Sequence, residues 1–416
     1  MDREPPDGDG ALTRRGFLGS AAAAAAVLLH ACKGRPIPGP SPDRPPLTAP
    51  AEPLPIPTRP LGRTGATVPI LALGGMFDTR SAQWHLRQTL AWGVSYWDTA
   101  DCYENGNSEE GLGRYLQRNP DQRGKVFLAT KSDAWDPEGL SRLLDQSLAR
   151  LHTSYVDYYM LHGLRDADAL TPAVRDWAQQ ARREGRVRLF GFSTHRNMAG
   201  LLKAAAATGW IDAVMAAINY RLLDDWEMRD ALAACQRAGV GVVAMKFRGG
   251  GPIPEDPQGQ ERLAAGLVAR GHTPDQAMLK ALWDHPAISS ICASMNDNDT
   301  LREYVAAALD PAPLAPGQRE ALRRHAEATR AGFCRACGAC EARCGGAPVA
   351  DAMRCLMYRS AYGDARRARE AFRALPAEAR ARLARVDGAA AEAACPNRLP
   401  VGRLVDEALR QLGPVA

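Results

Sequence analysis

Eight short apolar runs that alternate with amphipathic helical segments are the feature that most constrains the fold of this chain. Most of these runs carry apolar residues at consecutive positions, which is the pattern of parallel strands covered on both faces. In the clearest of the segments between them, Asp136 and Pro137 form a helix start before leucines that share one helical face. The runs span residues 70–73, 95–98, 126–130, 156–161, 187–192, 213–218, 241–245 and 290–293.

This alternation predicts an α/β fold, a (β/α)8 TIM barrel. Eight strand-helix units within about 250 residues match the usual size of that fold. A doubly wound open sheet is the main alternative, but we find no Gly-x-Gly-x-x-Gly turn after an early strand. The barrel is expected over residues 61–312 of a 416-residue chain whose 46% hydrophobic content can fill a large core.

Polar side chains follow the second, third and fourth runs, where a barrel places its functional groups. Asp98 is the last residue of the second run, Lys131 and His162 come directly after the third and fourth, and Tyr103 follows Asp98 by five positions. A phenol has a pKa of about 10, and a nearby cation lowers it toward the range of an efficient proton donor. Taken singly, Lys131 and His162 also fit a strand-end lysine and a core histidine. Together the four predict a catalytic corner with Tyr103 as the acid, Lys131 lowering its pKa, Asp98 holding Lys131, and His162 orienting the substrate oxygen.

Four motifs in the barrel segment resemble those of the aldo-keto reductases. The resemblance implies reduction of a small-molecule carbonyl by hydride transfer from a nicotinamide, with Tyr103 as general acid. It also identifies the segment around Arg59 to Gly62, with Val68 and Pro69, as the hairpin that closes the barrel floor. The motifs are Asp98-Thr99-Ala100 with Tyr103, Ala129-Thr130-Lys131-Ser132, Asp157-Tyr158-Tyr159-Met160-Leu161-His162 and Gly191-Phe192-Ser193-Thr194-His195.

The same resemblance implies a binding site for NADP or NAD, with departures from the family pattern. Thr194 stands where Asn is usual, Met215 occupies a Gln position, and Met245 falls where many members have a stacking Tyr. Ser294 and Thr300 replace the Lys and Arg that often hold the 2'-phosphate, so the choice between NADP and NAD stays open. The implied cofactor residues are Ser193, Thr194, Met215, Lys246, Arg248, Gly249, Ser294, Asn296 and Glu303.

A second region, expected over residues 325–416, contains the run Cys334-x-x-Cys337-x-x-Cys340-x-x-x-Cys344. This spacing is typical of ferredoxin-like domains, in which thiolates hold iron-sulfur clusters. Of a second run only Cys395, followed by proline, remains. We therefore expect one 4Fe-4S cluster on Cys334, Cys337, Cys340 and Cys395, with Cys344 as the alternative fourth ligand. Disulfides and zinc are the competing interpretations.

The N-terminal residues have the pattern of an export signal. Arg14 and Arg15 precede an alanine-rich, charge-free run that is too short to span a bilayer and ends at Cys32. Residues 1–32 are thus predicted to be a twin-arginine signal peptide read by the twin-arginine translocase, and residues 33–60 a proline-rich disordered linker. We expect a periplasmic or other extracytoplasmic protein, exported folded. Cys32 is a possible site of lipid attachment, through which alone the protein would be anchored to a membrane, and the sequence leaves this attachment open.

These features together resemble the iron-sulfur branch of the aldo-keto reductases. The leading hypothesis is an exported nicotinamide-dependent oxidoreductase whose cluster exchanges electrons with a bound nucleotide or with a redox partner protein. The alternative is a module that binds a nucleotide or transfers electrons without turnover, with a redox or structural cluster. The net charge of +5 comes from basic residues interspersed with acidic ones, which argues against nucleic acid as a partner. The sequence leaves the substrate, the reaction direction and the oligomeric state open.

Overall fold

A computed structural model of the chain describes residues 56–249, 257–269 and 271–413. The predicted signal peptide, Cys32 and the proline-rich segment up to residue 55 lie outside these ranges. Within them, no helix combines the length and the apolar character that crossing a membrane requires.

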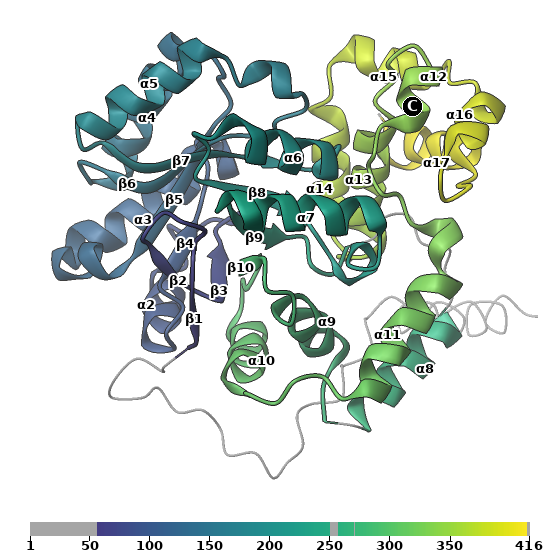
Figure 1. Ribbon diagram of the computed structural model, residues 1–416, viewed down its shortest axis with the longest axis horizontal. Helices are drawn as coiled ribbons and strands as arrows, with labels where there is room; N and C mark the ends of the chain where they lie inside the picture. The colour runs from purple at the N-terminus through teal and green to yellow at the C-terminus, as the bar shows by residue number, and fades with distance from the viewer. Residues whose placement is uncertain (1–55, 250–256, 270, 414–416) are drawn as a thin grey trace, which may run out of the picture. The chain divides into compact units, whose positions relative to one another are not determined.

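Eight parallel strands close into a barrel in the order β10-β3-β4-β5-β6-β7-β8-β9 (Figure 1). The predicted (β/α)8 barrel is therefore confirmed, and each predicted apolar run contains most of one strand. Some strands extend further than their apolar runs, so that β5 ends at Ser132 and β7 at Thr194. The strands are β3 (Leu71–Gly74), β4 (Tyr96–Asp98), β5 (Phe127–Ser132), β6 (Val156–Leu161), β7 (Val187–Thr194), β8 (Ala213–Ala217), β9 (Gly241–Met245) and β10 (Ile288–Ala293).

Helices follow the barrel strands in sequence. The helix start predicted at Asp136 is confirmed: in α4, Asp136 accepts a hydrogen bond from the Gly139 amide at 2.9 Å, which satisfies a free backbone donor. The helices are α2 (Gln83–Ala91), α3 (Asn107–Arg118), α4 (Pro137–Leu151), α5 (Pro172–Arg183), α6 (Met198–Thr208), α7 (Trp226–Ala238), α8 (Pro257–Val268), α9 (Pro274–Trp283) and α10 (Asn298–Leu309).

An antiparallel hairpin of β1 (Thr58–Pro60) and β2 (Thr67–Pro69) precedes the barrel. Leu61 in its turn is fully buried and packs with the residues of the barrel interior. Arg59 donates hydrogen bonds to the carbonyl oxygens of Trp283 at 2.5 Å and Ile288 at 2.8 Å. The hairpin thus plugs one end of the barrel, as the family resemblance implied.

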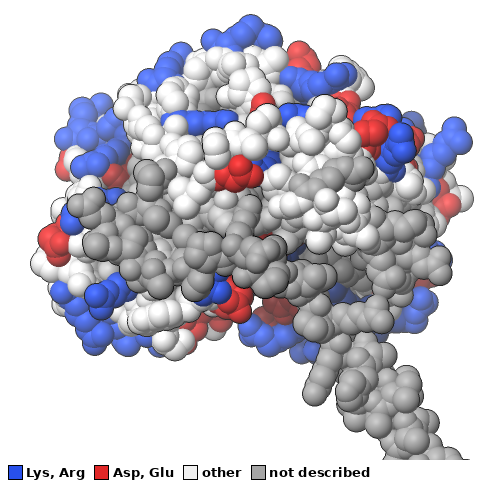
Figure 2. Space-filling view, turned by 90° about the horizontal axis from the view of Figure 1, so that it is seen from below, with Lys and Arg blue, Asp and Glu red and all other residues white. Residues whose placement is uncertain are grey.

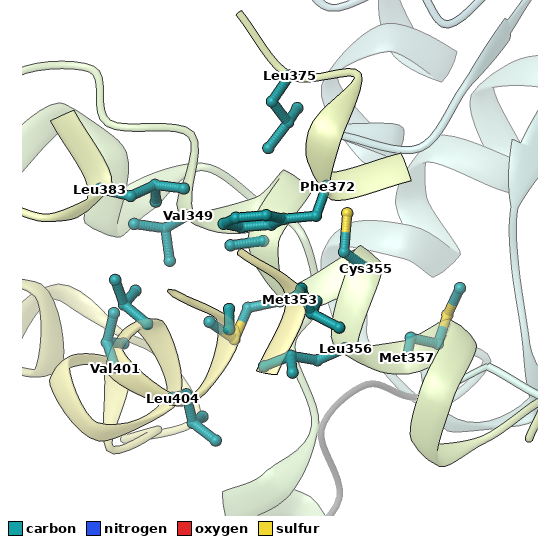
Figure 3. Packing of buried hydrophobic residues seen from close by; sticks show 14 of the residues in the cluster. Val349, Met353, Cys355, Leu356, Met357, Phe372, Leu375, Leu383, Val401 and Leu404 are labelled. Atoms are coloured by element: carbon teal, nitrogen blue, oxygen red, sulfur yellow. The ribbon is translucent and has the colours of Figure 1, made fainter. Parts of the chain in front are cut away.

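The chain after the barrel is helical and has its own hydrophobic core. α11 (Pro316–Ala328) packs on α8 and α9, and Leu322 is buried there beside Tyr220. Beyond it lies a second cluster of buried side chains, which includes Val349, Met353 and Phe372 (Figure 3). We call residues 333–413 the tail. Its helices are α12 (Ala339–Arg343), α13 (Val349–Ser360), α14 (Ala365–Arg373), α15 (Ala377–Leu383), α16 (Gly388–Ala394) and α17 (Val401–Leu412).

Charged side chains are interspersed on the surface. Figure 2 shows Lys and Arg next to Asp and Glu over the described part of one face. Exposed pairs such as Arg302 with Asp299, at 3.0 Å, are typical of this surface and contribute little to stability.

Candidate active site

Asp98 and Lys131 meet inside the barrel, near the C-terminal ends of adjacent strands. The Lys131 Nζ donates to Asp98 Oδ2 at 2.7 Å and to the Thr99 carbonyl at 2.6 Å. It also donates to the Tyr103 hydroxyl at 3.2 Å. The side chains of Lys131 and Asp98 are only 1% and 3% exposed, so they form a buried ion pair. The Tyr103 hydroxyl is hydrogen-bonded to this pair.

A tight turn after β4 brings Tyr103 to this pair. Glu104 and Asn105 both have positive φ, and Gly106 follows at φ 89°. This positive φ favours glycine, and a Cβ at Gly106 would in addition lie 2.7 Å from the Arg150 guanidinium. Arg150 holds the turn because its guanidinium donates to the Asp101 carbonyl at 2.9 Å.

His162 completes the corner from the end of β6. Its ring packs edge to face with the Tyr103 ring, with 5.7 Å between centroids. Its Nδ1 lies 2.6 Å from Asp133 Oδ1 and 3.6 Å from Cys102 Sγ. The structure therefore brings together all four residues that the sequence placed at the corner, and adds Cys102 and Asp133 beside the histidine.

The electrostatics of the corner differ from the sequence prediction in one respect. Burial raises the pKa of the Tyr103 phenol, and the opposing effect of Lys131 does not overcome it. The prediction that Lys131 brings this pKa below its ordinary value is thus wrong, because a buried phenolate loses its hydration. Burial alone would lower the pKa of Lys131, but Asp98 and Tyr103 raise it well above the ordinary value. Tyr103 accordingly keeps its proton and Lys131 its charge.

Replacing Lys131 with methionine is expected to destabilise the fold by about 3–5 kcal/mol, since it leaves the buried Asp98 carboxylate without its cation. Urea unfolding followed by circular dichroism measures this loss. The double variant Asp98→Asn/Lys131→Met is the matched control and should recover part of the loss. A single variant within 1 kcal/mol of the wild type would contradict the account of this pair.

The predicted cofactor residues on β7 and β8 line the same strand ends. Ser193 Oγ accepts from the Gly163 amide at 2.9 Å, so its own proton stays free to donate to a carboxamide. Thr194 Oγ1 instead donates to the Leu164 carbonyl at 2.9 Å and shapes the loop. Met215 and Met245 lie among the buried residues of the barrel interior. The nicotinamide end of the predicted site thus fits these residues.

The predicted cofactor residues after β9 already have partners within the protein. Lys246, at φ 58°, places its Nζ 4.8 Å from the centre of the Tyr358 ring on α13. Arg248 Nε donates to Asp275 at 2.9 Å, and its Nη2 donates to Tyr304 at 2.8 Å. Their role as phosphate ligands stays a prediction.

The other predicted cofactor residues lie in the loop after β9, after β10 and on α10. A Cβ at Gly249, where φ is 49°, would clash with Asn219 at 2.1 Å. Ser294 and Asn296 are exposed directly after β10. The Glu303 carboxylate accepts a hydrogen bond from Thr273. These residues are spread over several elements, and their binding role also stays a prediction.

Tyr358 is expected to make stability depend on pH. Burial alone would raise its pKa, but Lys246, Arg354 and Arg367 together lower it to about 7. The stabilisation from the folded-state phenolate is fully present above the unfolded pKa of about 10 and is lost as pH falls through 7. The free energy of unfolding should therefore rise between pH 7 and 10 by up to about 1.4 kcal/mol per unit more in the wild type than in Tyr358→Phe. Equal slopes in urea unfolding across this range would contradict it.

Four of the five candidate cluster cysteines face one cavity in the tail. Cys334, Cys337, Cys340 and Cys395 line it. Cys344 does not; its Sγ instead lies 3.7 Å from the Asp387 carbonyl oxygen. All described cysteines are free thiols, so the disulfide interpretation is wrong for these residues. A four-thiolate set around one cavity fits an iron-sulfur cluster.

The cysteine loop of the tail contacts the barrel loop that follows Ser193. The Asn197 amide donates to the Ala336 carbonyl at 2.8 Å, and Ala336 lies between Cys334 and Cys337. Arg196 pairs with the carboxylates of Glu341 and of Asp351, the latter at 3.1 Å. A second cavity bridges barrel and tail; its lining includes His195, Asn219, Lys246, Cys334, Met353 and Arg354. The sequence did not predict this contact between barrel and tail, because charged residues that meet across an interface show no recognisable spacing in the sequence.

Comparison with known proteins decides the family. The sequence model of the Aldo/keto reductase family matches residues 71–295. The chain belongs to the aldo/keto reductase family. It is therefore an oxidoreductase of the type that uses NAD(P)H. The region matched by the family model ends before the tail cysteines.

Individual relatives agree with this assignment, and a solved structure shares the fold. The chain is 26% identical over 302 residues to YqkF, an oxidoreductase of Bacillus subtilis, a match that covers 64% of this chain and 95% of YqkF. It is 28% identical over 271 residues to the aldo-keto reductase AMT2 of Alternaria alternata, over 53% and 73% of the two chains. The holo form of aldo-keto reductase AKR11C1 from Bacillus halodurans shares the fold at a TM-score of 0.55 and 22% identity, covering 65% of this chain and 96% of that one.

Proposed function

We propose that this aldo-keto reductase reduces a small carbonyl compound, or oxidises the corresponding alcohol, with a bound NADP or NAD. The observation that carries the proposal is the Tyr103 hydroxyl, which accepts a hydrogen bond from the buried Lys131 at 3.2 Å. Bound nicotinamide supplies the hydride. Tyr103 gives its proton to the carbonyl oxygen, Lys131 stabilises the phenolate that this leaves, and Asp98 keeps Lys131 in place. His162 orients the substrate oxygen.

We further propose that Cys334, Cys337, Cys340 and Cys395 hold one 4Fe-4S cluster. Their shared cavity, with Met353, supports this ligand set over one that includes Cys344. A bound cluster carries single electrons.

The contacts between barrel and tail support electron exchange between this cluster and the nucleotide site, or with a redox partner protein. Arg196 and Asn197 follow Ser193 by three and four residues, and both contact the tail. The test removes the cluster from purified protein by anaerobic chelation and compares aldehyde reduction with freely exchanging NADPH. The proposal expects a clear loss of rate or of electron transfer after cluster removal. An undiminished rate would contradict the coupling and leave the carbonyl chemistry of Tyr103 standing.

Export is part of the same proposal. A protein that needs a nucleotide and a cluster would be loaded in the cytoplasm and exported folded, which suits the twin-arginine translocase predicted from Arg14 and Arg15. Free nucleotide is scarce outside the cytoplasm, so we propose that it stays bound. Native mass spectrometry of protein purified from the cell envelope would report nucleotide, iron, sulfide and any lipid on Cys32 together.

A second candidate function is a module that binds a nucleotide or transfers electrons without turning over a carbonyl. The contacts of Lys246 with Tyr358 and of Arg248 with Asp275 favour the electron-transfer form of this module, because cations that are already paired are less available to hold a nucleotide phosphate. Tyr103→Phe separates the two functions, since a carrier would keep its reduction behaviour in this variant.

A further inference from the structure

We propose that Asp101, Cys102, Asp133 and His162 form a site for a transition-metal dication of the zinc class at the barrel mouth. One donor atom from each residue lies within 4.8 Å of all the others. The residues come from three successive connections, after β4, β5 and β6, so the closed barrel itself brings them together. A thiolate, an imidazole and two carboxylates are ligands that zinc takes in a tetrahedral site.

One of the donor distances matches that of a bound metal, and the others require small adjustments. Zinc bonds of about 2.0–2.3 Å place tetrahedral ligand atoms roughly 3.3–3.8 Å apart. Cys102 Sγ and His162 Nδ1 are 3.6 Å apart, which falls in this range. Asp133 Oδ1 and His162 Nδ1 are 2.6 Å apart and would have to separate by roughly 1 Å. Cys102 and Asp133 are exposed, so an ion can reach the site and small rotations can accommodate it.

Asp101 provides a second, independent observation. Its side chain is 7% exposed, and its Oδ1 has no hydrogen-bond partner within the described part of the chain. Its other oxygen accepts from the Asp133 amide at 3.2 Å, while Arg150 donates to its backbone carbonyl. The carboxylate is therefore held rigidly beside the cluster with one buried oxygen unsatisfied, a costly arrangement that a cation would relieve.

Metal binding would change the proton on His162. Nδ1 lies 2.6 Å from the Asp133 carboxylate, which accepts, so the proton of this hydrogen bond belongs to Nδ1. Zinc binding at Nδ1 would place the ring proton on Nε2, and only the Cys102 thiol proton would pass to solvent. From Nε2 the ring proton can donate to a carbonyl oxygen. This consequence rests on the proposed function, whereas the metal site does not.

Zinc binding to iron-loaded, anaerobically purified protein tests the site. After equilibrium dialysis against buffered Zn²⁺, we expect one zinc per chain, with a zinc K-edge X-ray absorption shell of one sulfur and three nitrogen or oxygen atoms. Cys102→Ser and Asp133→Asn should each lower zinc affinity at least tenfold. Cys344→Ser and Asp168→Asn, a thiol and a carboxylate away from the site, are the matched controls and should bind zinc as the wild type does.

Three results would overturn the proposal: no zinc retained, a shell of four sulfurs, which would place zinc in the cysteine cavity, or undiminished affinity in both site variants. Circular dichroism of each variant excludes unfolding as the cause of lost binding. Carbonyl reduction measured in zinc-free buffer tests the proposed function separately. Failure of the metal site therefore does not imply failure of the carbonyl-reducing function, and the reverse also holds.

Discussion

The variant Tyr103→Phe is expected to lower kcat/KM for carbonyl reduction by about 10²–10⁴-fold, the usual contribution of a positioned general acid. The change removes only the hydroxyl that lies 3.2 Å from Lys131 Nζ, and the phenyl ring can keep its edge contact with His162. Nucleotide affinity and the free energy of unfolding should therefore change little. The loss is measured as the rate of aldehyde-dependent NADPH oxidation under anaerobic conditions.

Tyr155→Phe is the matched control for this variant. Tyr155 lies before β6, at the opposite end of the strand from His162, and packs under Arg123 and Arg188. Its hydroxyl should contribute nothing to turnover. If Tyr103→Phe reduced aldehydes as fast as Tyr155→Phe, the assignment of Tyr103 as the acid would be wrong.

The variant Cys395→Ser is expected to lose most of the bound iron, which should be about four atoms per chain in the wild type. The physical reason is that Cys395 supplies the one thiol from outside the Cys334 to Cys340 run that faces the same cavity. Iron quantitation and low-temperature EPR of the reduced protein measure the effect. Cys344→Ser is the matched control and should keep both iron and spectrum, because the Cys344 thiol does not face the cavity.

Two outcomes would count against this ligand set. About eight irons per chain would require a second cluster. An EPR spectrum that is unaffected in Cys395→Ser but lost in Cys344→Ser would exchange the roles of the two cysteines.

The barrel and the proximity of Asp98, Lys131 and His162 were predictable because their causes are local or follow from the fold class. Apolar runs such as Gly241–Met245 identify strands buried on both faces, and the C-terminal ends of parallel strands meet at one mouth. Any polar residues at those ends, here Asp98, Lys131 and His162, must therefore lie near one another. The cysteines were predicted to share a site for a different reason, namely the close spacing of thiols within one run.

The features that could not be predicted depend on how deeply side chains are buried and on contacts between segments that are distant in the sequence. The direction of the Tyr103 pKa shift is set by how completely the corner is buried, which spacing does not reveal. Lys246 meets Tyr358 across more than a hundred residues, and Arg196 meets Asp351 over a similar separation. Spacing also left Cys344 and Cys395 as alternatives, and only the folded tail shows which thiol faces the cavity.

Reduction with a nicotinamide that carries deuterium at the transferable position tests the central claim most directly. An aldehyde panel is incubated anaerobically with the iron-loaded protein, and the alcohol products are analysed by mass spectrometry. We predict one deuterium at the former carbonyl carbon, formed by the wild type and nearly absent with Tyr103→Phe. Alcohol that contains no deuterium, or oxidised nucleotide without alcohol, would contradict hydride transfer at the corner of Asp98, Tyr103, Lys131 and His162.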